Sequence, residues 1–218
     1  MAQKEPIYVE TGAKRVFAGA VDWPGWHRAA RDEEAAVAAL VEYAPRYARV
    51  LRGTKLGFVA PTSPSEVRIA ERLPGDATTD FGAPDAAPKA DARRIDADRL
   101  AKDTAIYRAS WRVFERAAAA ADGVALRKGP RGGGRDLRKI VDHVVEAQES
   151  YIRLLGRKVS LDRGDMPGPV LEVLAEAVRD GVPPSPRGGK RWTPGFFVRR
   201  SVWHILDHAW EIEDRTPD

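Results

Sequence analysis

The sequence predicts an α+β fold, in which a small N-terminal β-β-α-β unit is followed by an antiparallel four-helix bundle. Three observations support this. Short apolar runs flanked by turn formers fill the first part of the chain, as is typical of strands. A stretch rich in proline and glycine follows at 74–92. Beyond it, apolar residues recur at spacings of three and four, which is the period of a helix with one buried face. We therefore expect domains at 1–85 and 95–218, with a linker at 86–94.

The N-terminal unit is expected to begin with two strands within residues 7–22, around a turn at Gly12-Ala13-Lys14. Asp32-Glu33-Glu34 begins a helix, because acidic side chains in the first turn suit the helix dipole. Pro45 ends or kinks this helix, since proline lacks the backbone N–H of a helical residue. The unit closes with a strand at about 66–72.

The C-terminal unit is expected to contain four helices, at 97–121, 135–155, 168–180 and 194–213. Gly181 stops the third of them. Thr193 is the predicted N-cap of the last helix, and Pro194 occupies its first position, where the missing N–H has no cost. Loops containing glycine and proline join the helices, as in a four-helix bundle.

The composition excludes several classes of protein. The chain has no cysteine, so disulfides, thiolate clusters and cysteine nucleophiles are absent, and any metal must be held by histidine and carboxylate. No apolar run approaches the roughly 18–20 residues of a membrane span. The N-terminus has no export signal, so we expect a cytoplasmic protein without a membrane partner. The net charge is only +4, and no aromatic residues interleave the basic segments, so nucleic acid is not the expected partner.

Three of the four histidines fall in the predicted bundle. His204 and His208 are four residues apart on the last helix, so they project about 40° apart on one face. His143 lies between Ile140 and Ala147, at core-facing spacing on the second helix. An imidazole there costs free energy unless it is hydrogen-bonded or ligated. If the two helices face each other, three imidazoles converge on one divalent metal that keeps an open position. Separate structural hydrogen bonds are the alternative.

Glu211 follows His208 by three residues on the same helix face. It is a candidate fourth ligand or catalytic base, and equally a surface partner for Arg215 at the i+4 position. Asp207 and Glu146 lie further from this face and are candidates for carboxylates that orient the ligands.

Basic loops precede both helices that carry the histidines. The first, at 127–139, contains Arg131 and Arg135, and the second, at 187–191, contains Arg191. Each loop leads into a helix N-terminus, where free N–H groups also favour anions. We therefore predict that these arginines bind a small anionic cosubstrate such as a carboxylated thiol. Solvated loops without a ligand are the alternative.

The helical half resembles a known family, the DinB superfamily, through segments 136–149 and 199–208. The resemblance covers about residues 95–215. It implies a four-helix bundle with zinc or nickel bound by His143, His204 and His208. Characterised members include transferases and isomerases that use low-molecular-weight thiols such as mycothiol or bacillithiol. The resemblance thus implies a metal-dependent transferase with such a thiol as cosubstrate.

The N-terminal half resembles the HicB-type antitoxin fold at residues 8–10, 17–19, 22–26 and 32–36. This resemblance implies a small oligomerisation or protein-binding module, so we expect a homo-oligomer, such as a dimer. Trp23 and Trp26 fit an interface patch and core packing equally well. His27 is expected to be an exposed structural residue, not a metal ligand.

Two other functions remain open. The metal could generate hydroxide for hydrolysis, with Glu211 as the base. The chain could instead be a non-catalytic binding or regulatory protein of the toxin–antitoxin type, which the antitoxin-like N-terminus and the basic loops favour.

Overall fold

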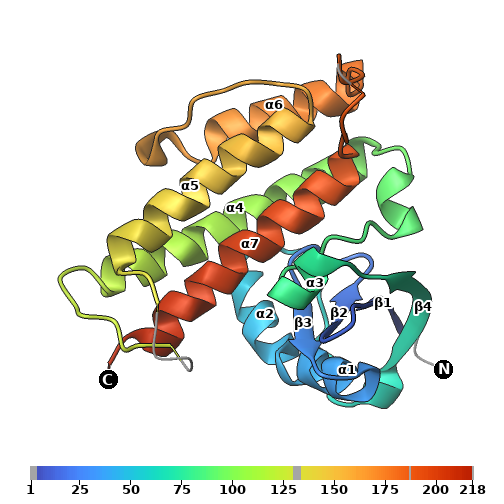
Figure 1. The fold of residues 1–218 in the computed structure, drawn as a ribbon, viewed down its shortest axis with the longest axis vertical. Coiled ribbons are helices and arrows are strands. Elements are labelled where there is room, and N and C mark those ends of the chain that lie inside the picture. Colours follow the sequence, from blue (N-terminus) through green and yellow to red (C-terminus); the bar gives the residue numbers. More distant parts are fainter. Residues whose placement is uncertain (1–3, 130–133, 187, 218) are drawn as a thin grey trace.

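The computed structural model describes residues 4–129, 134–186 and 188–217. Within them, the chain forms a mixed α/β structure with one four-stranded sheet and seven α-helices (Figure 1). The sheet belongs to the N-terminal part, and the four long helices after it make up the C-terminal part. The predicted order of a small sheet followed by a helix-rich half is confirmed.

The sheet has the strand order β3-β2-β1-β4. Its strands are β1 (Glu5–Thr11), β2 (Val16–Ala20), β3 (His27–Ala30) and β4 (Val67–Pro74). The first three are antiparallel neighbours, whereas β4 runs parallel to β1. A parallel return needs a crossover connection, and α1 (Glu33–Glu42) and α2 (Ala44–Val50) provide it.

The sequence pattern predicts neither β3 nor α2. β3 has only four residues and no β-branched side chain, and it forms because its backbone pairs with β2, from Gly19 opposite His27 to Val16 opposite Ala30. The predicted break near Pro45 is confirmed, because α1 ends at Glu42. The chain continues as α2, and Pro45 lies in the first turn of α2, where the absent N–H has no intrahelical partner to lose.

The helices after the sheet are α3 (Ala77–Phe81), α4 (Ala97–Ala120), α5 (Leu137–Leu154), α6 (Gly168–Asp180) and α7 (Pro194–Arg215). Short 3-10 helices occur at η1 (Pro64–Glu66), η2 (Lys89–Ala92) and η3 (Arg163–Asp165). The four long helices match the predicted segments to within two residues at each end. The predicted start of α7 is confirmed, because the Thr193 side chain accepts a hydrogen bond from the N–H of Phe196 at 3.2 Å.

Helix α7 is the central element of the molecule. It lies between the sheet and the other long helices and contacts α4, α5 and α6 (Figure 1). Most of its residues are buried around the whole circumference. One continuous core includes side chains from the sheet, such as Ile7 and Ala18, and from α7, such as Val202 and Ile212. Both parts of the chain therefore fold around the same helix.

Trp23 and Trp26 are core residues rather than an interface patch. Trp26 is fully buried and its Nε1 donates to the carbonyl oxygen of Leu40 at 2.8 Å, while Trp23 is 8% exposed. Both rings contact Phe58 edge to face. These contacts join the turn after β2 to α1 and to the segment after α2.

Segment 86–94, where a linker is expected, packs against α7 through η2. Arg199 of α7 is 1% exposed and binds both carboxylate oxygens of Asp91 at 2.7 Å. The same guanidinium donates to two carbonyl oxygens at the end of β2, those of Ala20 and Val21. One side chain thus holds the helix, η2 and the sheet together.

The expectation that His27 is exposed is wrong. The ring lies fully buried on β3, and its Nε2 is 3.0 Å from the Tyr8 hydroxyl. It fits because Gly19, its neighbour on β2, has no side chain. The buried position and the contact with Tyr8 are consistent with the expected structural role of His27.

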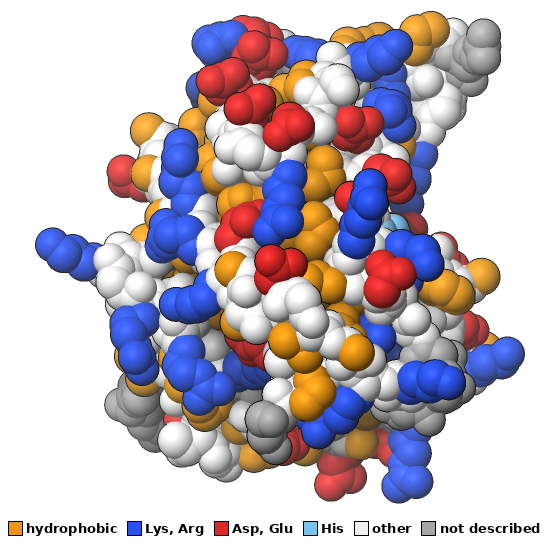
Figure 2. Space-filling model, turned by 90° about the vertical axis from the view of Figure 1, so that its left-hand side faces the viewer, with side chains coloured by type: hydrophobic (Ala, Val, Ile, Leu, Met, Phe, Trp, Pro, Cys, Tyr) orange, Lys and Arg blue, Asp and Glu red, His pale blue; other side chains and the backbone are white. Residues whose placement is uncertain are grey.

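No helix among the described residues has both the length and the apolar character needed to cross a membrane. Figure 2 shows one face of the molecule, on which basic and acidic side chains surround a strip of exposed hydrophobic ones.

Candidate metal centre

Helices α5 and α7 position the three histidines. The side chain of Asp136, the N-cap of α5, accepts a hydrogen bond from the N–H of Lys139 at 2.9 Å. Thr193 caps α7 in the same way. Since each cap fixes where its helix begins, it also fixes the direction of the side chains that follow. His143 lies about two turns into α5, and His204 and His208 lie about three and four turns into α7.

The three imidazole rings converge. One ring nitrogen from each of His143, His204 and His208 lies within 4.8 Å of the other two. The ring centroids are 5.0 Å apart for His143 and His204, 5.1 Å for His143 and His208, and 4.6 Å for His204 and His208. Two rings come from consecutive turns of α7 and the third from α5. The histidines are therefore close enough to hold one metal ion.

His143 lies at the edge of the buried stripe of α5 and not at its centre. The fully buried positions of this helix include Ile140, Val144 and Gln148, whereas His143 and Ala147 are half-buried. The expected core-facing stripe is therefore displaced by about one residue. As a result, His143 is the most accessible of the three histidines, because His204 and His208 are 5% and 8% exposed.

The distance between two of the ring nitrogens matches that of two ligands bound to the same metal ion. Nε2 of His143 lies 3.2 Å from Nε2 of His204. Two nitrogens bound to one tetrahedral zinc at about 2.05 Å are about 3.3 Å apart. If both nitrogens carried lone pairs they would repel each other, so they share either one proton or one cation. Nδ1 of His204 is buried and has no partner among the described residues, so the pair is not part of a longer hydrogen-bond chain.

Glu211 orients His208. Nδ1 of His208 donates to Oε2 of Glu211 at 2.8 Å, which leaves Nε2 as the nitrogen available to a ligand. The other oxygen, Oε1, accepts from Nη1 of Arg215 at 2.6 Å. A carboxylate that holds the far nitrogen of a metal-binding histidine is a common arrangement in metalloproteins. Glu211 thus contacts His208 and also Arg215, the partner at the i+4 position that the sequence offers as an alternative.

Arg215 attaches this network to the first basic loop. It is 8% exposed, and its Nε and Nη2 donate to the carbonyl oxygens of Arg127 and Arg135 at 2.7 and 2.8 Å. The N–H of Arg127 in turn donates to the carbonyl oxygen of Arg215 at 2.7 Å. The end of α7 and the loop before α5 are therefore fixed to each other beside the histidines.

The environment disfavours the protonated forms of His143 and His204. Burial, together with the nearby His208 and Arg135, lowers the pKa of His143 to about 4. Burial and the same cationic neighbourhood lower the pKa of His204 well below its usual value. Although burial alone raises the pKa of Glu211, its hydrogen bond from His208 and its ion pair with Arg215 bring it below the ordinary value. At neutral pH, His143 and His204 are thus unprotonated, which is the form of imidazole that binds metals.

Of the three arginines predicted to bind a cosubstrate, the structure describes two, and their surroundings differ. Arg135 is exposed, and its charge acts on His143 and His204. Arg191 is directed elsewhere, since its side chain donates to the carbonyl oxygens of Pro183 and Arg153. Arg131 lies outside the described residues.

The two outer carboxylates also lie apart from the rings. Asp207 is 3.8 Å from Arg28, which stacks on Tyr43 on the sheet side of α7. The side chain of Glu146 is exposed on α5. Neither forms a hydrogen bond with a histidine in the described structure.

Sequence reasoning misses Arg200, one turn before His204. Its side chain is 8% exposed, and Nε and Nη1 have no partner among the described residues. The guanidinium lies 4.5 Å from the Trp203 ring and 5.5 Å from the Tyr151 ring, and the latter packs against His204. Its charge contributes to the lowered pKa of His204. The signal in the sequence that indicates Arg200 is an arginine four residues before a predicted ligand, within an apolar helix.

No protein-family model matches the sequence, and no curated protein or solved structure matches the chain.

Proposed function

We propose that this chain is a divalent-metal-binding protein in which His143, His204 and His208 hold zinc or nickel. The observation that carries the proposal is the meeting of three imidazoles from two helices, with one ring nitrogen of each within 4.8 Å of the others. In the same proposal, α4, α5, α6 and α7 form a DinB-like four-helix bundle, which brings the second and fourth of these helices side by side.

The surrounding residues support a site with an accessible side. Three protein nitrogens leave at least one position for another ligand, and a metal in such a site favours the deprotonated form of a bound thiol or water. Half-buried His143 marks the side from which a small molecule reaches the rings. Glu211 keeps His208 in the tautomer that presents Nε2, and Arg215 keeps Glu211 in place.

We further propose that the site serves a transferase that uses a low-molecular-weight thiol. The resemblance to DinB proteins suggests the thiol, and exposed Arg135 beside the rings favours a cosubstrate with carboxylate groups. A hydrolase in which Glu211 is the base has less support, because both oxygens of this carboxylate are already engaged. We therefore regard Glu211 as a positioning residue.

The first experiment measures metal content. Four proteins are each equilibrated with zinc or nickel and dialysed: wild type, His143→Ala, His204→Ala and the control Glu146→Gln. The control changes an exposed carboxylate on α5, the helix that carries His143. Elemental analysis is expected to give about one ion per chain for wild type and control, and little for either histidine variant. Equal metal in all four proteins, or none in wild type, would contradict the metal site.

The thiol is tested separately on the nickel-loaded protein. Addition of a carboxylated thiol is expected to produce a new absorption band from thiolate bound to nickel. If metal binds as expected and no candidate thiol changes the spectrum, the transferase proposal fails while the metal site stands.

Glu211→Gln tests the orienting role. The amide keeps the size of the side chain but removes the charge that holds His208 and Arg215, so metal affinity is expected to fall about 10–100-fold. Competition with a chromophoric chelator measures this, with Glu146→Gln again as the control. Unchanged affinity in Glu211→Gln would show that the contact with His208 does not support metal binding.

A further inference from the structure

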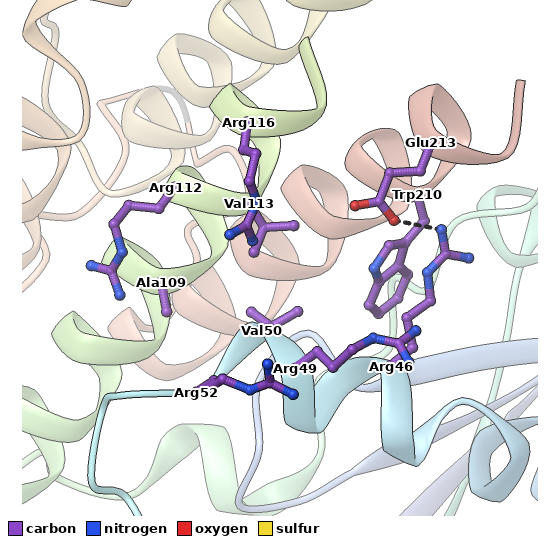
Figure 3. A pocket seen from close by; sticks show the side chains of 10 residues that line it. All are labelled: Arg46, Arg49, Val50, Arg52, Ala109, Arg112, Val113, Arg116, Trp210 and Glu213. Carbon is purple, nitrogen blue, oxygen red and sulfur yellow. Dashed lines mark hydrogen bonds and ion pairs between the residues drawn. The ribbon is translucent and has the colours of Figure 1, made fainter. Parts of the chain in front are cut away.

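A cleft lies on the other side of α7 from the histidines. Trp210, two residues after His208 and therefore about 200° around the helix, lines this cleft. The cleft has a volume of about 450 Å³ and is bounded by α2, α4 and the end of α7 (Figure 3). Its lining residues are Arg46, Arg49, Val50, Arg52, Ala109, Arg112, Val113, Arg116, Trp210 and Glu213.

The cleft gathers five arginines. Arg46, Arg49 and Arg52 follow one another at intervals of three along α2 and just beyond its end, and Arg112 and Arg116 are one turn apart on α4. Figure 3 shows these two groups on opposite walls. Neighbouring helix positions with like charge repel each other. The cleft therefore concentrates positive charge from two separate elements.

Only one of these arginines is neutralised within the described part of the chain. Arg46 pairs with Glu213 at 2.6 Å and with Asp214 at 2.8 Å. The other four side chains that line the cleft form no ion pair among the described residues, although the chain has 32 acidic residues. Arg46 shows how a carboxylate is held at this edge, and the remaining guanidinium groups are left for an anion from outside the chain.

The shape of the cleft favours a small ligand. Its volume falls in the range of about 300–1,000 Å³ that is usual for small-molecule sites. Val50, Ala109 and Val113 supply an apolar surface between the charged walls. A single-stranded nucleic acid instead needs a basic groove along its path with aromatic side chains free for stacking, and Trp210 is only 3% exposed.

The guanidinium group has a planar fork of N–H donors that binds two phosphate oxygens at once. Four such groups on two walls of the same cleft suit several adjacent anionic oxygens. We propose that this cleft binds a small molecule with two or more linked phosphate groups, of the nucleoside diphosphate or triphosphate class. The arginines bind the phosphates, and the apolar surface contacts the rest of the ligand. The proposal does not depend on the metal site.

Calorimetric titration of the full chain with ATP and with inorganic triphosphate tests this, in buffer without divalent metal. The cleft variant Arg112→Gln/Arg116→Gln is compared with Arg68→Gln/Arg94→Gln, which removes the same charge from exposed side chains on β4 and after η2. We expect affinity for both ligands to fall about tenfold or more in the cleft variant. In the control it should change by less than about twofold, since distant surface charges are screened. His204→Ala should bind as wild type does.

Glutamine is a good helix former, so the cleft variant should fold, which circular dichroism verifies. Arg49→Gln, on the opposite wall, gives a second reading on a different helix. No binding by wild type, or equal losses in the cleft and control variants, would overturn the proposal. So would a single-stranded oligonucleotide that binds more tightly than triphosphate and loses affinity in the cleft variant, because the cleft would then serve nucleic acid.

Discussion

The absence of a side chain at Gly19 determines where His27 lies. A Cβ atom at position 19 would overlap Cδ2 of His27 and would lie 2.8 Å from Cε1 of Tyr8. The ring of His27 therefore occupies space that the side chain of any other amino acid at position 19 would fill. A polar ring after a turn suggests exposure from sequence alone, because the sequence does not show which residue lies across the strand.

Gly19→Ala should destabilise the fold, because the added methyl group displaces either His27 or Tyr8 from a fully packed position. We expect the free energy of unfolding to fall by about 1–3 kcal/mol, measured by urea denaturation. Gly168→Ala is the matched control, since a methyl group added there, at the start of α6, would meet no described atom within 4 Å beyond its chain neighbours and the backbone of its own helix. Equal stability of the two variants would show that the sheet can make room at this point.

The candidate ligands are predictable at the residue scale, whereas their supporting contacts are not. The i, i+4 spacing of His204 and His208 places them on one helix face in any helix. His143 lies 61 residues earlier, and its approach to His204 depends on how two helices pack. The sequence leaves open whether Glu211 contacts His208 or Arg215, and in the structure its carboxylate binds both.

At the scale of elements, the sequence predicts best what depends on local geometry. The long helices follow from apolar spacing and from caps such as Thr193. The four residues of β3 depend on pairing with β2, which local propensity does not contain. On α5, the buried stripe includes Gln148, because Tyr107 donates to its Oε1 at 2.9 Å. A glutamine is expected to face solvent, and this is why the sequence predicts the stripe about one residue away.

Thr193→Ala tests the start of α7, the helix that carries two of the ligands. The substitution leaves the N–H of Phe196 without its acceptor, so the free energy of unfolding should fall by about 1 kcal/mol. Thr193→Ser keeps the hydroxyl group and should stay close to wild type. Thermal and urea unfolding of both variants provide the measurement. If the alanine and serine variants have the same stability, the cap contributes nothing to α7.

At the scale of the whole molecule, α7 serves the sheet and the helices together. Its buried surface includes polar side chains, and the largest fully buried one, Arg199, has partners from two different elements. Arg199 binds Asp91, which lies 108 residues earlier, and two carbonyl oxygens of the sheet. The sequence shows separate apolar patterns on either side of residues 74–92. It cannot show that an arginine within the last helix joins them, since no local spacing relates these residues.

Disruption of this buried pair should therefore affect the whole chain. Asp91→Asn leaves the Arg199 guanidinium without a counter-charge in the interior, and breaking such a pair costs about 3–5 kcal/mol of unfolding free energy. Replacement of both partners, in Arg199→Met/Asp91→Leu, removes the buried charge and should cost less than Asp91→Asn alone. Asp180→Asn, which breaks the exposed pair with Arg179, should have no measurable effect. Urea denaturation monitored by tryptophan fluorescence and by circular dichroism compares the variants. If Asp91→Asn unfolds at the same urea concentration as Asp180→Asn, Arg199 does not hold the sheet to α7. If the two probes separate in Asp91→Asn, the sheet and the helices unfold independently once the pair is lost.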